Sequence, residues 1–258
     1  MKIVRYESNQ SVTYGVLEQN TSIVKELYGD PFAKIEFSGK EIDMNEIKIV
    51  SPVVPSKIIC VGLNYQQHIK EMNLTNPTRP MIFMKPASSL IGLGDSIIYP
   101  KNASRVEYEG ELVVVMGKTG RNISEENALE YVFGYTCGND VTERVIQKEE
   151  MSSGALLISK GFDTFCSLGP LIATEINPDN TNLITKHNGI IKQETNTSDL
   201  LFSVRSLIAY LSSCMTLIPG DVILTGTPSG VGPLVVGDRI EVEIEGIGNL
   251  HNVVLSEE

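Results

Sequence analysis

Histidine, paired cysteines and long apolar runs are all scarce in this chain of 258 residues. Its three histidines are His68, His187 and His251. Their wide separation argues against a zinc-dependent hydrolase with a histidine-rich metal site. Its four cysteines are Cys60, Cys137, Cys166 and Cys214. They form no CxxC pair and lie mostly among apolar residues, which indicates buried, reduced thiols.

The sequence also shows no membrane segment and has fewer positively than negatively charged residues. No uninterrupted apolar run has the length of a transmembrane helix, and residues 1–7 lack the apolar region of a signal peptide. We therefore expect a cytoplasmic protein outside the membrane. The net charge of −11 argues against nucleic acid or an anionic membrane as a partner, because neither would be attracted to such a surface. An anionic substrate would need a local positive site.

The composition, with 41% hydrophobic and 21% charged residues, is typical of one large globular domain or one domain with a small appendage. Residues 1–52 alternate between apolar and polar in short segments such as 2–6 and 13–17, separated by turns such as Asn9-Gln10. This pattern predicts a small β-rich N-terminal region. Residues 51–56 contain two prolines and are a plausible linker.

Two glutamates begin the most informative stretch of the chain. In a β-strand Glu109 and Glu111 point to the same side, with Gly110 between them, and the apolar run 112–116 predicts a strand buried on both faces. Two carboxylates in such a place repel each other and lose hydration unless a positive charge compensates them. With Asp140 as a third oxygen donor, the set suits a hard ion such as Mg²⁺ or Mn²⁺. Alternatively, the glutamates lie at a wet strand end and Asp140 caps a helix.

A possible general base follows an earlier strand. Residues 57–62 predict a buried strand, and Asn64 can cap the short helix after it. On that helix His68 and Glu71 are neighbours at i,i+3, which is a general-base arrangement, although an ordinary solvated surface pair has the same spacing. The loop-like residues 73–80 could let this helix move as a lid.

A second helix is predicted to begin at Asp140. At about 100° per residue, Asp140, Arg144 and Gln147 then fall on one stripe. Arg144 could also simply pair with Glu143 or another carboxylate. Lys160 lies beside a glycine in an apolar context, although a lone lysine is usually a surface residue.

The C-terminal part mixes one helix with several strands. An amphipathic helix is predicted to begin at Ser198 or Asp199, and residues 219–232 predict a turn, a buried strand and a glycine-rich loop without P-loop spacing. Residues 239–245 and 250–255 predict two strands joined by a glycine-containing turn. Together these segments favour a β-rich α+β fold over a regular βαβ repeat.

The order of these motifs resembles the fumarylacetoacetate hydrolase family, especially its acylpyruvase-like and 2-hydroxyhepta-2,4-diene-1,7-dioate isomerase-like members. The matching stretches, which span nearly all of residues 57–254, are Val61-Gly62-Leu63-Asn64-Tyr65 with His68 and Glu71, Tyr108-Glu109-Gly110-Glu111-Leu112, Gly138-Asn139-Asp140-Val141-Thr142, Lys160-Gly161-Phe162-Asp163-Thr164-Phe165, Asn188-Gly189 with Gln193, Pro219-Gly220-Asp221, and Gly226-Thr227-Pro228-Ser229-Gly230-Val231-Gly232. Any one of these motifs is weak, but their combination in this order is highly specific.

The resemblance implies a mixed β-sandwich roll at residues 57–258, preceded by the β-rich region 1–52, and a homodimer. It implies a small-molecule 2-oxo acid as the partner. The site residues that it implies are Glu109, Glu111 and Asp140 for Mg²⁺ or Mn²⁺, His68 and Glu71 as a dyad on a lid, and Lys160, Gln147 and Thr227 at the substrate. Arg144, on the same stripe as Gln147, is a further candidate for substrate binding.

Two places depart from the family pattern. Glu143 and Val145 replace the small residue and the acid common there, and residues 151–158 differ from the usual approach to the lysine. Both places are expected near the substrate pocket, so they bear on which substrate is used.

The activity implied is metal-dependent hydrolytic C–C cleavage of a 2,4-dioxo acid of the acylpyruvate or fumarylacetoacetate type. His68, oriented by Glu71, would activate water, and the cation with Lys160 would stabilise the enolate of the product. The same site suits an oxaloacetate decarboxylase or a 2-oxo dioate isomerase or tautomerase. A ligand-binding protein that kept the fold without the chemistry is a further alternative.

Overall fold

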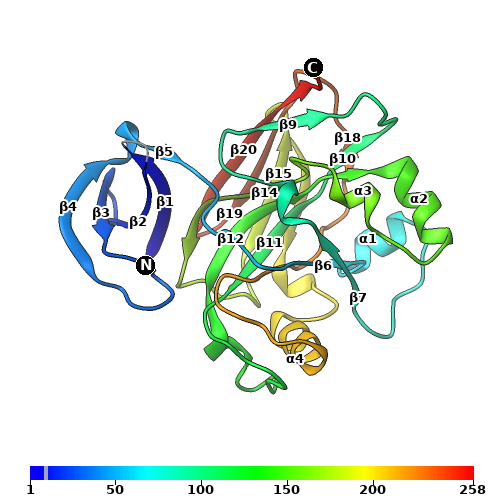
Figure 1. The fold of residues 1–258 in the computed structure, drawn as a ribbon. Coiled ribbons are helices and arrows are strands. Elements are labelled where there is room, and N and C mark those ends of the chain that lie inside the picture. The colour runs from blue at the N-terminus through cyan, green and yellow to red at the C-terminus, as the bar shows by residue number, and fades with distance from the viewer. Residues whose placement is uncertain (9–10) are drawn as a thin grey trace.

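Strands outnumber helices in the described residues, where they form three sheets (Figure 1). The computed structural model describes residues 1–8 and 11–258, so the turn predicted at Asn9-Gln10 lies outside the described residues. Within the described ranges no helix is long and apolar enough to cross a membrane. The architecture confirms the predicted β-rich α+β fold with an N-terminal β region.

The largest sheet has the strand order β4-β3-β2-β1-β14-β12-β11-β17-β6-β7, with β5 beside β1 and β8 beside β14. Its strands are β1 (Lys2–Ser8), β2 (Ser11–Leu17), β3 (Ile23–Leu27), β4 (Phe37–Asp43), β5 (Lys48–Ile49), β6 (Ile58–Gly62), β7 (Met81–Lys85), β8 (Leu90–Ile91), β11 (Gly110–Met116), β12 (Val132–Asp140), β14 (Cys166–Ala173) and β17 (Val222–Leu224). Predicted strands at residues 57–62 and around residue 223 are therefore confirmed as β6 and β17.

Two smaller sheets and a few short helices complete the fold. One sheet contains β13 (Thr142–Glu143), β10 (Val106–Tyr108) and β18 (Gly232–Pro233). The other contains β16 (Ile190–Asn196), β15 (Asn182–His187), β19 (Arg239–Ile244), β20 (Gly248–Ser256) and β9 (Ser96–Tyr99). The α-helices are α1 (Gln66–Glu71), α2 (Arg144–Ser152), α3 (Ile158–Gly161) and α4 (Val204–Cys214). Single 3₁₀ turns are η1 (Met44–Glu46), η2 (Ala87–Ser89), η3 (Ala128–Tyr131) and η4 (Thr197–Asp199).

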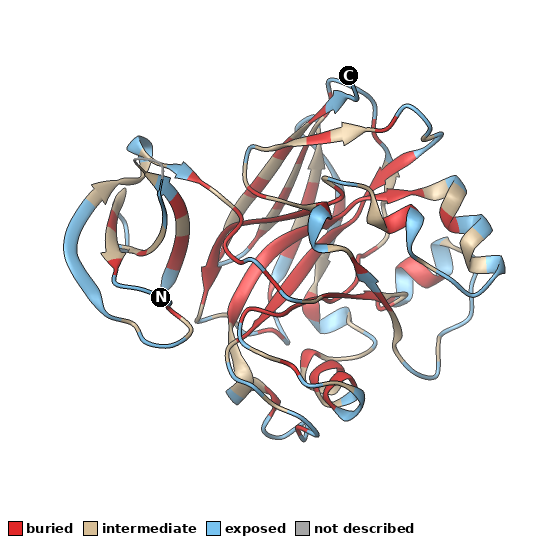
Figure 2. Ribbon diagram, in the orientation of Figure 1, coloured by how far each residue is buried: buried red, intermediate tan, exposed pale blue. Residues whose placement is uncertain are grey.

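Strand β11 lies at the centre of the core, as its apolar run predicts. All of its residues are buried, and β12 and β17 flank it (Figure 2). Leu112 and Val114 belong to an apolar cluster on one face of the sheet, and Val113 and Val115 belong to another on the opposite face. Helix α4 packs against the first cluster. Burial on both faces fixes the register of β11 and, with it, the positions of the two glutamates at its start.

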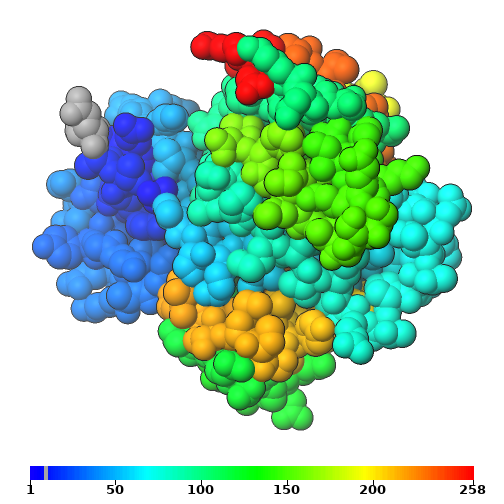
Figure 3. Space-filling model, turned by 45° about the vertical axis from the view of Figure 1, so that its right-hand side comes forward, coloured from blue at the N-terminus to red at the C-terminus, as the bar shows by residue number. Residues whose placement is uncertain are grey.

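The N-terminal strands continue the main sheet. Strand β1 pairs with β14 through Lys2 opposite Ala173 and Ile3 opposite Ile172. In the space-filling view the N-terminal residues, in blue, lie against the rest of the chain (Figure 3). The division into residues 1–52 and 57–258 remains a prediction.

The predicted cap of α1 is wrong. Asn64 uses its side chain elsewhere: its amide nitrogen donates to the carbonyl oxygens of Phe202 and Thr225, and its amide oxygen accepts from the backbone nitrogen of Phe202. The N-cap of α1 is Tyr65, whose side chain makes no capping hydrogen bond. Asn64 therefore joins the start of α1 to two distant segments.

The predicted starts of two other helices are also wrong. Asp140 is the last residue of β12, and α2 begins only at Arg144. Helix α4 begins after Ser203, which caps it, because Ser198 and Asp199 lie in a separate 3₁₀ turn. In both cases a polar residue that favours helix caps lies a few residues before the true start.

Candidate active site

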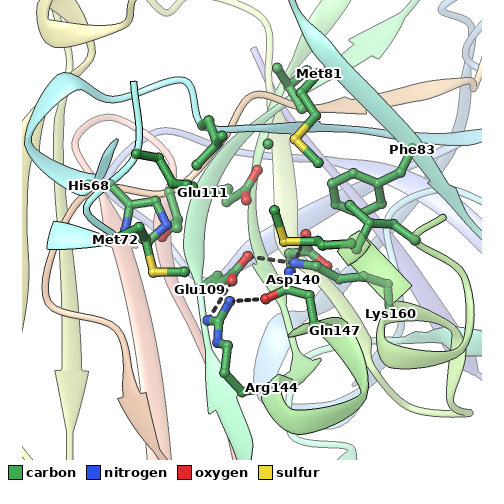
Figure 4. A pocket seen from close by; sticks show the side chains of 17 residues that line it. His68, Met72, Met81, Phe83, Glu109, Glu111, Asp140, Arg144, Gln147 and Lys160 are labelled. Atoms are coloured by element: carbon green, nitrogen blue, oxygen red, sulfur yellow. Dashed lines mark hydrogen bonds and ion pairs between the residues drawn. The ribbon is translucent and has the colours of Figure 1, made fainter. Parts of the chain in front are cut away.

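Three buried carboxylates converge where β11 and β12 pair. The antiparallel register places Gly110 opposite Asn139, so the next two residues, Glu109 and Asp140, also lie opposite each other. Glu109, Glu111 and Asp140 are 5%, 1% and 1% exposed, and each offers a carboxylate oxygen within 4.8 Å of those of the others (Figure 4). This burial rules out the wet strand end. The grouping predicted from the sequence is present, although Asp140 ends a strand rather than capping a helix.

Gly110 lets the neighbouring sheet approach these carboxylates closely. A β-carbon at this position would lie 2.0 Å from Oγ1 of Thr185, which is closer than atoms can pack. The backbone nitrogen of Gly110 donates to the side-chain oxygen of Gln193 at 3.0 Å. Strands β15 and β16 thus support β11 from the side opposite to the carboxylates.

Two buried lysines compensate the carboxylates. Nζ of Lys160 lies 2.7 Å from Oε2 of Glu109 and 2.7 Å from Oδ2 of Asp140. Nζ of Lys85 lies 2.6 Å from the other oxygen of Asp140 and donates to the carbonyl oxygen of Val141. The interpretation of Lys160 as an ordinary surface lysine is therefore wrong.

Lys85 was missed by the sequence reasoning. It shares the inward face of β7 with Phe83, and both are buried. A charged residue on the apolar face of a short strand is the signal that could have identified it.

Arg144 binds carboxylates on two sides of the site. Its guanidinium donates through Nε to Glu107 at 2.7 Å, through Nη2 to Glu109 at 2.8 Å and through Nη1 to the side-chain oxygen of Gln147 at 2.6 Å. Glu107, which the sequence reasoning did not single out, is 2% exposed and also pairs with Arg105 at 2.6 Å. Arg144 therefore holds Glu109 and Gln147 in fixed orientations.

These contacts set opposite proton affinities for the two glutamates. Burial would raise the pKa of Glu109, but Lys160 and Arg144 outweigh it and hold that pKa well below its usual range. Burial, followed by the charges of Asp140 and Glu109, raises the pKa of Glu111 well above its usual range. In the described part of the chain Glu111 makes no ion pair, and its Oε2 accepts a hydrogen bond of 2.6 Å from the backbone nitrogen of Gly226.

The donor set fits a hard divalent cation. Three buried carboxylates, without histidine or cysteine, match the oxygen ligands that Mg²⁺ and Mn²⁺ prefer. A cation between them would supply the positive charge that Glu111 lacks. Glu109, Glu111 and Asp140 are therefore the candidate ligands of a divalent metal.

His68 and Glu71 form the predicted pair on α1. Nδ1 of His68 lies 3.0 Å from Oε2 of Glu71, and His68 is 5% exposed, so it is not a solvated surface residue. The other oxygen of Glu71 accepts from the backbone nitrogen of Gly230 at 3.0 Å. The hydroxyl of Tyr108 donates to the carbonyl oxygen of Gly230 at 3.1 Å. The glycine-rich loop thereby fixes the orientation of Glu71 and, through it, of His68.

Thr227, in the same loop, lies beside the carboxylates. Its hydroxyl donates to the carbonyl oxygen of Gly110 at 3.0 Å and accepts from the amide of Gln193 at 2.8 Å. It is 4% exposed. Thr227 is therefore held in place from two sides.

One cavity brings the predicted residues together. Every predicted site residue except Glu71 lines it, and Glu71 contacts the lining residue His68. The remaining wall is mostly apolar and includes Met72, Leu74, Met81, Phe83, Met151 and Leu156.

The two departures from the family pattern have different places in the structure. Glu143 and Val145 do not line the cavity. Glu143 is fully buried, caps α2 at the nitrogen of Ile146, and accepts from the backbone nitrogens of Ser104 and Arg105 at 2.9 Å each. Glu143 thus has a structural role, whereas residues 151–158 contribute to the cavity wall.

The chain matches known proteins along its whole length. Residues 57–255 match the family described as fumarylacetoacetate (FAA) hydrolase C-terminal, and residues 1–52 match that described as Rv2993c-like, N-terminal. The mitochondrial oxaloacetate tautomerase fahd2 of Xenopus laevis is 40% identical over 225 residues, which cover 83% of this chain and 70% of that protein.

Two solved structures are similar over the full length of both chains. The crystal structure of 5-carboxymethyl-2-hydroxymuconate delta-isomerase from Mycobacterium smegmatis has a TM-score of 0.93 and 38% identity, and each chain is covered to 100%. That of maleylpyruvate hydrolase from Sphingobium sp. SYK-6, in complex with manganese(II) and pyruvate, has a TM-score of 0.82 and 28% identity, with the same coverage.

Proposed function

The chain belongs to the fumarylacetoacetate hydrolase family, and we propose that it cleaves a C–C bond of a 2,4-dioxo acid by hydrolysis and depends on Mg²⁺ or Mn²⁺. The substrate class would be acylpyruvates and related acids, with pyruvate as one product. The observation that carries this proposal is the convergence of three buried carboxylates, a buried lysine and a histidine–glutamate pair on one cavity.

The candidate metal site would explain how an acidic protein binds an acidic substrate. Glu109, Glu111 and Asp140 would hold a divalent cation, which would supply the positive charge that an anionic 2-oxo acid needs at an acidic protein. The manganese and pyruvate named for the similar maleylpyruvate hydrolase support this assignment. Chelator treatment should therefore remove activity, and adding Mg²⁺ or Mn²⁺ should restore it.

His68 has the geometry of a general base. Glu71 occupies Nδ1 of His68 and would keep the proton on that nitrogen, so Nε2 remains to take a proton from water. The water oxygen then bonds to C4 of the substrate, and the C3–C4 bond breaks. C3 receives a proton to give pyruvate.

Lys160, Gln147 and Thr227 would act on the substrate itself. Lys160 is fully buried between two carboxylates, and burial lowers its pKa less than Asp140 and Glu109 raise it, so it stays an ammonium. A fixed positive charge stabilises negative charge that develops on the substrate. Gln147 and Thr227 line the same cavity and offer an amide and a hydroxyl.

Isomerisation or tautomerisation is the second candidate. It needs only proton transfers at the same place, and it is favoured by the similarity to a tautomerase and to an isomerase. Decarboxylation of oxaloacetate would pass through the same enolate of pyruvate without an attacking water.

The family resemblance also predicts a homodimer, which light scattering of the purified protein would test.

The test measures pyruvate release from chelator-stripped protein with and without Mg²⁺ or Mn²⁺, on acetylpyruvate and oxaloacetate in parallel. Metal-dependent release from acetylpyruvate supports hydrolysis. Release from oxaloacetate alone would move the assignment to a decarboxylase. If neither yields pyruvate while the enol absorbance of oxaloacetate decays faster with enzyme, the protein is a tautomerase.

A further inference from the structure

The cavity has two parts. The inner part is formed by the charged side chains of Glu109, Glu111, Asp140, Arg144 and Lys160, and the outer part is apolar. In the inner part, each cation is already engaged: Lys160 by Glu109 and Asp140, and Arg144 by three partners that occupy Nε, Nη1 and Nη2. Lys85, behind Asp140, is engaged as well. No lysine or arginine in this part is therefore available to a second anionic group.

The outer part is formed by thioether, aliphatic and aromatic side chains from four segments. Figure 4 shows Met81 and Phe83 above the carboxylates and away from Arg144, whereas Met72 lies on the same side of the view as His68. The outer wall consists of Met72, Leu74, Met81, Phe83, Met151 and Leu156. A substrate whose 2-oxo acid end lies beside Glu109, Glu111 and Asp140 would extend along this wall, which forms the rest of the cavity.

The outer wall has no positive charge of its own: Nζ of Lys160, 4.9 Å from the centre of the Phe83 ring, is held by Glu109 and Asp140. Among the described residues that line the cavity, the only lysine and arginine are Lys160 and Arg144, both in the inner part. The cations on the adjoining segments, Lys70, Arg79 and Lys148, are exposed and do not line the cavity. A second carboxylate placed against this wall would lose its hydration without gaining an ion pair, which is unfavourable.

We propose that the substrate of this site carries a single carboxylate and ends in an apolar acyl tail, rather than in a second acid group. This inference rests on the proposed function, because it assumes that the inner part binds a 2-oxo acid. The reaction would be R–CO–CH₂–CO–COO⁻ + H₂O → R–COO⁻ + CH₃–CO–COO⁻ + H⁺, where R is an alkyl chain. The products are a fatty acid anion and pyruvate.

The methionines in the wall add an expectation about tail length. A methionine side chain is unbranched and flexible, so it adapts its packing to neighbours of different shape. Three of the six wall residues are methionines: Met72, Met81 and Met151. The site should therefore accept several tail lengths and gain affinity as methylenes are added, until the tail fills the wall.

The test compares two ligands that differ only at the far end. 2-Oxoheptanoate and 2-oxoheptanedioate have the same chain length, and neither has the 4-oxo group that cleavage requires. Titration calorimetry with the Mg²⁺-loaded protein should show that the monoacid binds at least about tenfold more tightly than the diacid. Equal or tighter binding of the diacid would overturn the inference and leave the proposed function intact. If neither ligand binds, both fail.

Two variants separate the wall from the overall charge of the protein. Met81→Lys places an ammonium in the wall, whereas Met84→Lys adds the same charge on the same strand at a residue that is 40% exposed and outside the cavity. The preference for the monoacid should fall about tenfold or more in the first variant and stay unchanged in the second. An equal fall in both would show that the preference comes from net charge alone and would contradict the inference.

Arg79 provides the remaining check, because it lies in the 73–80 segment that could move over the cavity. With Arg79→Gln the ratio of the two affinities should not change. If that variant instead loses diacid affinity selectively, Arg79 reaches a second carboxylate and the inference is wrong.

Discussion

Replacement of Lys160 tests the electrostatic account of the site. Lys160→Met keeps much of the side-chain volume but removes the ammonium that bridges Glu109 and Asp140 at 2.7 Å each. Without a metal, Glu109 then keeps only Arg144 and Asp140 keeps only Lys85 as a cationic partner among the described residues. Removing one partner of a buried ion pair typically costs about 3–5 kcal/mol, because the other partner stays buried and uncompensated.

For a chain of this size, that loss corresponds to a fall in Tm of roughly 6–20 °C in metal-free protein. The lower end is expected, because Glu109 remains paired with Arg144 and Asp140 with Lys85, so neither carboxylate is left uncompensated. Added Mn²⁺ should close part of the gap. In the variant, Lys160 no longer competes with Mn²⁺ for the oxygens of Glu109 and Asp140, so Mn²⁺ should stabilise the variant more than the wild type. For the wild type, free Mn²⁺ at 100 times its Kd contributes about 2.7 kcal/mol of stability.

The assay is thermal unfolding of chelator-treated protein, repeated with increasing Mn²⁺. Lys186→Met is the control, because Lys186 makes one 2.7 Å pair with Glu243 at the surface, and its loss should move Tm little and leave the Mn²⁺ effect unchanged. The reasoning is refuted if metal-free Lys160→Met is as stable as the wild type, or if both gain equally from Mn²⁺.

Three further variants test other parts of the site. His68→Ala should lower kcat about 10²–10⁴-fold while Mn²⁺ affinity, measured by calorimetry, stays the same; full activity would remove the general-base assignment. Glu143→Ala removes the acceptor of three part-buried backbone donors, those of Ser104, Arg105 and Ile146, and should destabilise the protein by about 1–3 kcal/mol in total in urea unfolding. No change in stability would contradict the capping role of Glu143. Gly110→Ala should lower the free energy of unfolding by about 1–3 kcal/mol, because the new methyl group overlaps Oγ1 of Thr185. Adding Thr185→Ala should recover part of that loss. If the two losses of stability are additive instead, the overlap is not the cause.

Local sequence patterns predicted much of the candidate site. The pairing of Glu109 with Glu111 follows from the period of a strand, and that of His68 with Glu71 from the period of a helix. The continuous apolar run of β11 identified a strand buried on both faces. Each of these signals lies within a few residues of the chain, so no tertiary contact is needed to read it.

The features that sequence reasoning missed depend on contacts between distant segments. Lys85 is defined by its pair with Asp140, 55 residues away, and Asn64 is drawn from the helix cap by Phe202, 138 residues away. Asp140 looked like a helix start because acids favour caps, but its pairing with Cys166 in β14 keeps it in the sheet. Tertiary pairing overrides local preference at these residues.

The binding of a divalent cation by the three carboxylates is the central claim, and calorimetric titration of chelator-stripped protein with Mn²⁺ tests it most directly. We predict one Mn²⁺ per chain for the wild type and a large loss of affinity for Glu111→Gln, in which the carboxylate without an ion pair is neutralised. Unchanged Mn²⁺ binding by this variant, or no binding by the wild type, would contradict the account.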